Sequence, residues 1–556
     1  MASLIKKKSK YSTYYVIAES GRVNGKPRIV KQWYLGTIEK LIAIAEGHPE
    51  REQPQQIDCL EEGSVAALFK IAEELGVRET VNMIVPKRKQ GMSVGDYLLV
   101  AALNRALAAS SKVKIREWVD QTALHLYLPL DRDKLDSQNF WDHFNLLDEA
   151  TVERIGDALS RRAVEIEKLA LDCLVYDTTN YYTYWDVLNP SELARMAHSK
   201  DGKHSLRHYG MALAVERDWG LPLFHRLYPA NDHDSKVFGR LLGTMMEQLS
   251  ATVSDKRGLT FVFDKGNNSE EAIACLDESR HHFVGCRSSY HHRDLCRLHL
   301  DRYTPQEIPD HEEAVLPVHE TREELYGKMR RVLVVYNEAT CHRQIHRMER
   351  NLESAKRELS FFKKKAKSAD GRSTLDSINR QAQEIVDHYH VHALLDIDVA
   401  EEQEGYRVST RKNFPAIEDL KTRFGKQILF TNRETLSAAE IVKIYLDRAI
   451  VEDAFRMTKS DHWVKMTPAF HWTDSKIRVH ALTCVIALLL VRIAHKRARE
   501  RGFVHGASRM LELLRGVRSA MMFYPKSSKP MRQVCHLSED QEVLLKALSV
   551  DLSKRM

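Results

Sequence analysis

The sequence predicts an α/β protein with a mixed β-sheet. A large α+β insertion interrupts this core, and an N-terminal β-hairpin and helical region precedes it. Strand-like and helical patterns alternate between residues 171 and 286, which is typical of a sheet flanked by helices. Two strand-like runs, 171–177 and 259–264, end in an aspartate. The chain has 556 residues. Single cores rarely exceed about 250–300 residues, so we expect several domains.

Composition and charge indicate a soluble globular protein. Apolar residues make up 43% and charged residues 29% of the chain, which is ordinary for this class. A net charge of +7 permits a polyanionic partner without requiring one. The eight cysteines show no paired framework, and no apolar stretch follows the basic first ten residues, so we expect a cytoplasmic location. The longest apolar run, Ala481–Val491, is too short to cross a bilayer, so we expect no membrane contact.

The N-terminal region, residues 1–52, is predicted to form a β-hairpin. Runs rich in β-formers at Tyr11–Ala18 and Arg28–Leu35 flank a turn signal at Gly21–Gly25. Basic residues interleave with aromatic ones, as on surfaces that bind nucleic acids. A solubilising basic tail on a small packed sheet explains the same pattern equally well.

Residues 60–147 are predicted to be a helical, DNA-binding domain. Ser64 and Ser93 are expected N-caps, Pro86 separates two helical segments, and Val94–Ala109 carries an apolar stripe at helical spacing. Basic connectors at 87–89 and 112–116 would suit contacts with DNA. A purely structural helical bundle is nearly as good an interpretation, because no segment can be identified as a recognition helix.

The first part of the sheet domain is predicted at 168–289, after an amphipathic helix at 148–169. Strands ending near 177, 216 and 228 are followed by a helix from 234, a strand to 264, a helix from 269 and a strand at 282–286. This order matches a ribonuclease-H-like core. By alternation, Asp177 shares a face with Val175, and Asp264 shares a face with Val262.

An inserted domain is predicted at 290–433, because 188 residues separate Asp264 from Glu452 and no simple connection is that long. It combines a strand at 331–336, a charged helix at 340–367 and later strands. Its run Lys363–Lys367 could contact phosphates, although a solvated helix end is the commoner explanation. The core's second part follows at 434–501, and we assign no task to 502–556.

A continuous helix over Tyr445–Lys459 is predicted to carry four functional side chains on one face. Ser437 and Glu440 form a capping box just upstream. At 100° per residue, Tyr445, Arg448, Glu452 and Lys459 fall within an arc of roughly 60°. A carboxylate beside cations suits metal-dependent nucleic-acid chemistry, whereas a solvated charged face is the default alternative. Asp453 points about 100° away and is the weaker acid candidate.

These three motifs, in this order, resemble the Asp-Asp-Glu transposases of bacterial insertion sequences. The helix is similar to the group marked by Tyr-x2-Arg-x3-Glu-x6-Lys, including insertion-sequence 1634-type enzymes. The resemblance spans about 168–501, and the opening forty residues also look similar. Relatives use an aromatic of a mostly β insertion to hold a flipped base. This insertion has helical content and no Trp, so we assign no such residue.

The resemblance implies a site and a reaction. Asp177, Asp264 and Glu452 would be the catalytic acids and would bind two Mg²⁺ ions, with Mn²⁺ able to substitute. Asp177 would bridge the ions, and the other two acids would each hold one. Tyr445, Arg448 and Lys459 would grip phosphates near the element's end, although Tyr445 could equally be a packed core aromatic. The partners would be the terminal inverted repeats, target DNA and a second copy of the chain, in a bacterial, nucleoid-associated setting.

Other functions remain open at this stage. A ribonuclease-H-like nuclease without strand transfer would keep the same acids, and a DNA-binding protein that has lost catalysis would keep the fold alone. Cysteine and histidine residues between 286 and 299 lack the paired spacing of a structural zinc site. The terminal-repeat sequence, the target preference and a hairpin intermediate are beyond what the residues reveal.

Overall fold

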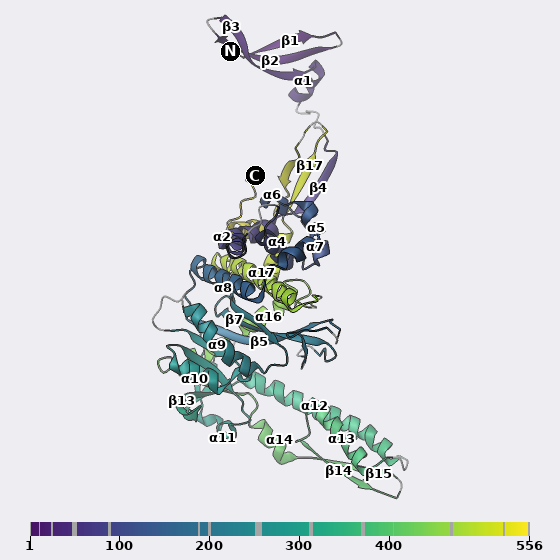
Figure 1. Ribbon diagram of the computed structural model, residues 1–556, viewed down its shortest axis with the longest axis vertical. Coiled ribbons are helices and arrows are strands. Elements are labelled where there is room, and N and C mark those ends of the chain that lie inside the picture. The colour runs from purple at the N-terminus through teal and green to yellow at the C-terminus, as the bar shows by residue number, and fades with distance from the viewer. Residues whose placement is uncertain are drawn as a thin grey trace.

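The computed structural model describes residues 2–10, 12–23, 26–46, 53–86, 91–186, 189–197, 199, 202–250, 258–310, 315–368, 373–403, 405–467, 471–525, 527 and 529–553. The molecule is elongated (Figure 1). A small N-terminal sheet lies at one end, and an arm formed by part of the insertion lies at the other. The large mixed sheet and its covering helices lie between them.

The N-terminal sheet has three strands rather than the predicted two. β1 (Ala2–Lys8), β2 (Thr13–Val23) and β3 (Lys26–Gly36) form an antiparallel sheet in the order β1-β2-β3, followed by α1 (Ile38–Ala45). The lysine-rich start is itself a strand, because every residue of β1 has a partner in β2. The predicted turn is displaced, since β2 continues through Gly21, and Asn24 and Gly25 lie outside the described residues.

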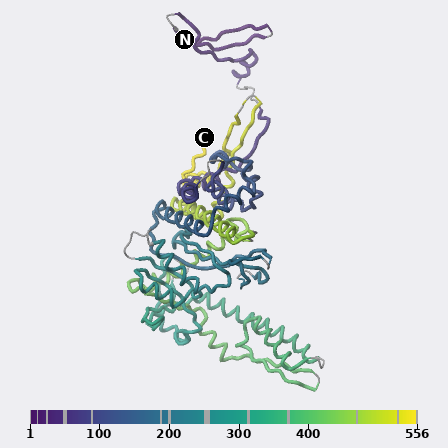
Figure 2. Tube along the Cα trace, viewed as in Figure 1, coloured from purple at the N-terminus to yellow at the C-terminus, as the bar shows by residue number. Residues whose placement is uncertain are grey.

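The helical region is completed by the C-terminal segment. Ser93 forms a capping box with Asp96 at the start of α4 (Val94–Leu107), as predicted, whereas Ser64 lies inside α2 and Glu62 takes the N-cap position. β17 (Arg518–Phe523) pairs with both β4 (Gln56–Glu61) and β18 (Met531–Val534). Figure 2 shows the yellow C-terminal trace beside the blue and purple N-terminal helices. The other elements here are α2 (Gly63–Leu75), α3 (Val77–Ile84), α5 (Ile115–Asp120), α6 (Leu124–Tyr127), α7 (Ser137–Phe144), α8 (Glu149–Ile166), α18 (Ala507–Arg515) and α19 (Glu539–Ala547).

The large sheet has ten strands in the order β11-β12-β13-β16-β10-β9-β5-β7-β6, with β8 paired to β7. β9 runs parallel to β5 and β10, and β7 runs antiparallel to β5. This mixed sheet is consistent with a ribonuclease-H-like core. Its elements up to β10 are β5 (Cys173–Thr183), β6 (Arg195–Met196), β7 (Arg207–Glu216), β8 (Pro222–Pro229), α9 (Asp234–Ser250), β9 (Thr260–Phe263), α10 (Glu270–Glu278) and β10 (His282–Arg287).

The limits predicted for the insertion, 290–433, do not coincide with the edge of the core sheet. β16 pairs with β10, and β13 pairs with β16, because these strands are apolar and continue the sheet. Within the described residues of the predicted insertion, the segment from α12 to α14 has a hydrophobic core separate from that of the sheet. The elements are α11 (Arg293–Arg297), β11 (Thr304–Glu307), β12 (Val315–Leu325), β13 (Lys328–Tyr336), α12 (Glu338–Lys367), α13 (Leu375–His388), β14 (Leu395–Glu401), β15 (Tyr406–Lys412), α14 (Phe414–Lys421) and β16 (Lys426–Thr431).

The helix predicted over Tyr445–Lys459 is two helices. α15 (Ala438–Leu446) ends at Asp447, and α16 (Ala449–Thr458) begins after Arg448. The single-helix projection therefore does not describe this segment. α17 (Asp474–Glu500) is long and apolar enough to span a membrane, but 94% of its most apolar window is buried inside the protein. It is the central core helix, packed against α2, α4, α8 and β8.

Candidate active site

Two aspartates occupy matching positions of neighbouring parallel strands, Asp177 within β5 and Asp264 directly after the end of β9. The register pairs Tyr176 of β5 with Phe263 of β9, so Asp177 and Asp264 are the next residues along the two strands. The sequence predicted that Asp177 ends its strand, but the strand continues beyond it. β5 continues to Thr183 because its second half pairs with β7. An Asp177 carboxylate oxygen accepts a hydrogen bond from the Thr178 backbone N–H at 2.8 Å.

α15 and α16 cover the face of the sheet that carries these aspartates. Tyr181 shares this face with Asp177 by alternation, and its hydroxyl lies 2.6 Å from the Thr458 hydroxyl of α16. Tyr176, on the other face, packs against Phe238 of α9. The sheet therefore separates α9 from the two helices that carry the remaining predicted site residues.

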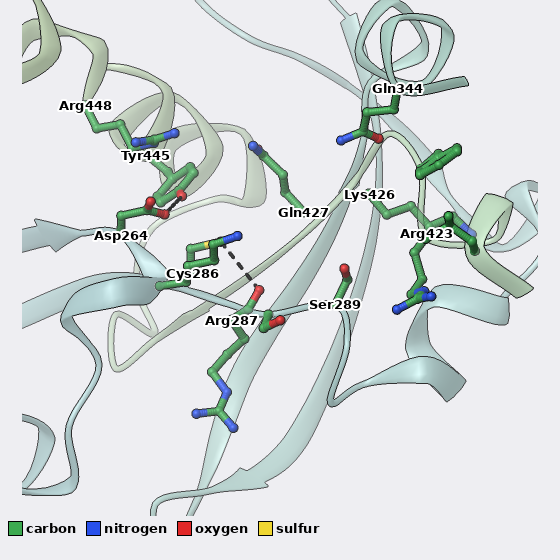
Figure 3. A pocket seen from close by; sticks show the side chains of 14 residues that line it. Asp264, Cys286, Arg287, Ser289, Gln344, Arg423, Lys426, Gln427, Tyr445 and Arg448 are labelled. Carbon is green, nitrogen blue, oxygen red and sulfur yellow. Dashed lines mark hydrogen bonds between the residues drawn. The ribbon is translucent and has the colours of Figure 1, made fainter. Parts of the chain in front are cut away.

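Tyr445 connects α15 directly to Asp264. Its hydroxyl donates a hydrogen bond to Asp264 Oδ1 at 3.1 Å, and its ring is almost fully buried (Figure 3). Burial raises the pKa of Tyr445 far above its ordinary value, and the neighbouring Cys286 and Asp264 raise it further. The phenol therefore stays protonated and acts as a permanent donor to Asp264.

Arg448, at the break between α15 and α16, links three of these groups. Its guanidinium lies 5.1 Å from the Tyr445 ring centre, and Nη1 donates to Glu452 Oε1 at 2.9 Å. Burial alone would lower the pKa of Arg448, but its electrostatic interactions with Tyr445, Asp264 and Glu452 outweigh burial and raise the pKa. The break places Arg448 at the N-cap position of α16, one helical turn before Glu452.

Lys459 lies at the opposite end of α16. It occupies the C-cap position, and its Nζ is 5.5 Å from the centre of the Tyr181 ring. The four residues of the Tyr-Arg-Glu-Lys motif thus come from two short helices over one sheet face, rather than from one stripe of a continuous helix.

The family follows from the sequence match that covers these elements. The profile described as "Transposase DDE domain" matches residues 186–490, which is more than half of the chain. The chain belongs to the transposase DDE domain family. DDE transposases are enzymes that act on DNA, and in general they use divalent metal ions. The match includes Asp264, Tyr445, Arg448, Glu452 and Lys459, and it begins nine residues after Asp177.

Two further comparisons add little to this assignment. No curated protein matches the sequence. Among solved structures, the fold is similar to a piggyBac transposase synaptic complex with hairpin DNA, at 8% sequence identity and a TM-score of 0.38. That alignment covers 83% of this chain and 82% of the other. The TM-score is too low for this likeness to support an argument about the site.

The acids of this DDE transposase are engaged with protein groups. Within the described ranges, no three His, Cys, Asp or Glu side chains are grouped so that they could hold a metal ion. Asp264 accepts a hydrogen bond from the Tyr445 hydroxyl. Glu452, whose side chain is 56% exposed, forms an ion pair with Arg448. Asp177 and Asp264, at matching positions of neighbouring strands, nevertheless offer the hard oxygen donors that Mg²⁺ prefers. The register thus places two of the predicted acids on neighbouring strands, whereas the third, Glu452 of α16, is paired with Arg448 and is not grouped with them among the described residues.

A basic cavity of about 300 Å³ adjoins Asp264 in this transposase (Figure 3). Asp264, Tyr445 and Arg448 form one side of it, and Gln344, Arg423 and Lys426 of the insertion form the other. Lys265 and Arg287 also line it. The sequence pattern missed Arg287 and Lys426. Their positions at the ends of adjacent strands β10 and β16 could reveal them only if the pairing of those strands were known.

Proposed function

We propose that the chain is the transposase of a bacterial insertion sequence of the Tyr-Arg-Glu-Lys type. It cleaves the terminal inverted repeats of its element and joins the 3′ ends to target DNA. The observation that carries the proposal is the register of β5 and β9, which sets Asp177 beside Asp264 under α15 and α16. Membership of the DDE family supports it.

The acids supply the ligands for the proposed chemistry. Asp177, Asp264 and Glu452 would hold Mg²⁺, or Mn²⁺ in its place. Divalent ions at such a site stabilise the attacking and leaving oxygens of an in-line phosphodiester displacement. Tyr445 fixes one oxygen of Asp264 by its hydrogen bond, which orients the carboxylate.

Arg448 and Lys459 would bind phosphates at the end of the DNA. Arg448 forms a charge-assisted hydrogen bond with Glu452. A phosphate that takes over this guanidinium would release the carboxylate toward the two aspartates. Lys459, at the far end of α16, offers a point charge to a second phosphate. DNA binding and assembly of the three acids are thereby coupled through one arginine.

The alternatives differ from this proposal in their products. A structure-specific nuclease without strand transfer would nick the DNA and stop. A DNA-binding protein without catalysis would leave it intact. Excision through a hairpin, pairing of two copies of the chain to bring two ends together, and action on the bacterial nucleoid in the cytoplasm are parts of the proposal that rest on the resemblance.

Cleavage of a labelled duplex tests the proposal. The duplex carries the end of the DNA element that encodes the chain, and the wild type is compared with Glu452→Gln and with Glu512→Gln, an exposed glutamate of α18. With Mg²⁺, we expect nicking followed by joined or hairpin products from the wild type and from Glu512→Gln, and none from Glu452→Gln. Unchanged cleavage by Glu452→Gln would remove Glu452 from the site. Nicks without joined or hairpin products would favour the nuclease.

A further inference from the structure

The positive charge of the protein is concentrated in its first 46 residues. They contain nine Lys and Arg against three Asp and Glu, a net charge of +6 out of +7 for the whole chain. Residues 60–147, predicted as the DNA-binding domain, contain eleven basic and twelve acidic residues, a net charge of −1. A duplex attracts basic surfaces, so electrostatics favour the N-terminal sheet over the helical region.

The two central helices of the helical region, α2 and α4, are not free to enter a groove. α4 has twelve buried residues out of fourteen, and α2 has ten out of thirteen. Both pack against α17 in the centre of the molecule. A recognition helix must expose one face to base edges, and neither of these can do so.

The strand order puts the cations on the two edges of the N-terminal sheet. β1 carries Lys6 and Lys8 at one edge, and β3 carries Lys31 at the other. The central strand β2 contributes Tyr15 and Ile17 between them. Glu19 of β2 lies on the same face opposite Lys31, but at Tyr15 and Ile17 the residues between the charged edges are apolar or aromatic. This part of the surface matches a groove bordered by two phosphate backbones.

The two faces of this sheet differ. Val16 and Ala18 point to one face and are fully buried. The register aligns Leu4, Ile17 and Trp33 across the three strands on the opposite face. There Leu4 is 59% and Trp33 41% exposed, and the Lys31 ammonium lies 4.8 Å from the Trp33 ring centre. We call this surface, which contains Leu4, Lys6, Lys8, Tyr15, Ile17, Lys31 and Trp33, the open face.

We propose that the open face of the N-terminal sheet binds the duplex of the terminal repeat in its major groove. This inference rests on the proposed function and specifies where the repeat is recognised. Three strands spaced about 4.8 Å apart are roughly 10 Å wide, and the major groove is about 12 Å wide. Lys6, Lys8 and Lys31 meet the phosphates, while Leu4 and Trp33 contact base edges and thymine methyl groups. The sheet lies at the end of the molecule farthest from the insertion arm (Figure 1). Hence it can hold DNA outside the catalytic region.

Two matched pairs of variants of the full chain test this. Lys6 and Lys7 are adjacent on β1 but point to opposite faces, and Lys7 donates to Gln32 at 3.2 Å. Trp33 and Tyr34 are adjacent on β3 with the same alternation. Affinity is measured by fluorescence anisotropy at several salt concentrations. The probes are the element-end duplex and a random duplex of equal length.

We expect Lys6→Ala to weaken binding to both duplexes several-fold and to lower the salt slope by about 0.9, the value for one lost phosphate contact. Trp33→Ala should lose most of the preference for the element end. Lys7→Ala and Tyr34→Ala should bind like the wild type. If the paired variants behave alike, or if the open-face variants bind normally, the inference is wrong while wild-type nicking still upholds the proposed function. A wild type that neither binds nor nicks the element end would overturn both.

Discussion

Tyr445 and Arg448 organise the acids of the site at the residue scale. The neutral Tyr445 hydroxyl donates a hydrogen bond to Asp264, and the charged Arg448 guanidinium donates one to Glu452. Tyr445 lies near the end of α15 and Arg448 at the break between α15 and α16, so a small change in that backbone would alter both contacts. The sequence identified these residues by their spacing. It could not show that Tyr445 contacts an aspartate 181 residues earlier.

Tyr445→Phe is predicted to reduce nicking by about tenfold or more, because loss of a partner that orients a metal ligand typically costs 10–100-fold in affinity or activity. The ring still fills its buried position, so thermal stability should change little. Tyr209→Phe is the control, since Tyr209 is also buried but its hydroxyl has no hydrogen-bond partner among the residues that the structure describes. Nicking rates over a Mg²⁺ titration measure the effect. Equal rates for the two variants would contradict a positioning role for Tyr445.

Lys112 is predicted to make stability depend on pH. Burial lowers its pKa to about 7, with a further reduction from Arg105, and its ammonium lies over the rings of Trp141 and Phe144. Between pH 7 and its ordinary pKa near 10.5, the unfolded chain binds a proton that the folded protein does not. The free energy of unfolding therefore rises with pH in this window. Below pH 7 it is reduced by the full cost of burying the charged ammonium.

Lys112→Met removes that penalty and keeps the apolar stem. We expect a higher melting temperature than the wild type at pH 7 and a smaller difference at pH 10, in thermal unfolding followed by circular dichroism. The exposed Lys365→Met controls for loss of charge alone. A variant less stable than the wild type at pH 7 would show that the charged form of Lys112 stabilises the fold.

At the scale of the element, α16 is anchored to the core helix by the acid next to Glu452. Asp453 Oδ2 lies 2.5 Å from Arg492 Nη2 of α17, and Arg492 is almost fully buried. Arg456 forms a second, exposed ion pair with Asp453. Burial raises the pKa of Asp453, but the two arginines lower it by more, so the net shift is downward. The carboxylate is therefore ionised at neutral pH.

Asp453→Asn should lower the free energy of unfolding by about 3 kcal/mol, because it leaves the Arg492 charge buried and uncompensated. Arg456→Ala removes only the exposed partner and should cost less than about 1 kcal/mol. Urea titration of both variants gives the comparison. If Asp453→Asn retained full stability but lost nicking, Asp453 would have to be reassigned to the catalytic acids.

Elements with local signals were predicted well, and elements set by distant contacts were not. Asp148 caps α8, Ser269 caps α10 and Ser437 caps α15, and each cap is readable from neighbouring residues. The break at Asp447 has no Gly or Pro signal. Its carboxylate lies 3.8 Å from Arg217 at the end of β7, a tertiary contact that no helical projection includes. The adjacency of Asp177 and Asp264 likewise required the register of two strands, which alternation alone does not provide.

At the scale of the whole molecule, the described residues form two large hydrophobic cores and one small cluster of Leu60, Ala123 and Met521. One large core joins the helical region, the sheet, α17 and the C-terminal helices, and the other lies within the arm from α12 to α14. The pairing of Arg518 with Glu61 makes the C-terminal segment part of the helical region. Strand partners so far apart cannot be recognised from one sequence, so no task was predicted for 502–556.

Because the arm has its own core, we predict that it opens as a separate cooperative unit. Leu359 of α12 and Leu488 of α17 are both fully buried, one in each core. Truncation of a buried leucine to alanine costs about 2–5 kcal/mol. In Leu359→Ala this loss should speed hydrogen exchange across α12, α13 and β14 and leave β5, β9 and α17 protected. In Leu488→Ala it should speed exchange through the helical region and the sheet. Mass spectrometry of peptides from both variants makes the comparison, and faster exchange of β5 and β9 in Leu359→Ala would mean that the arm and the catalytic sheet unfold as one unit.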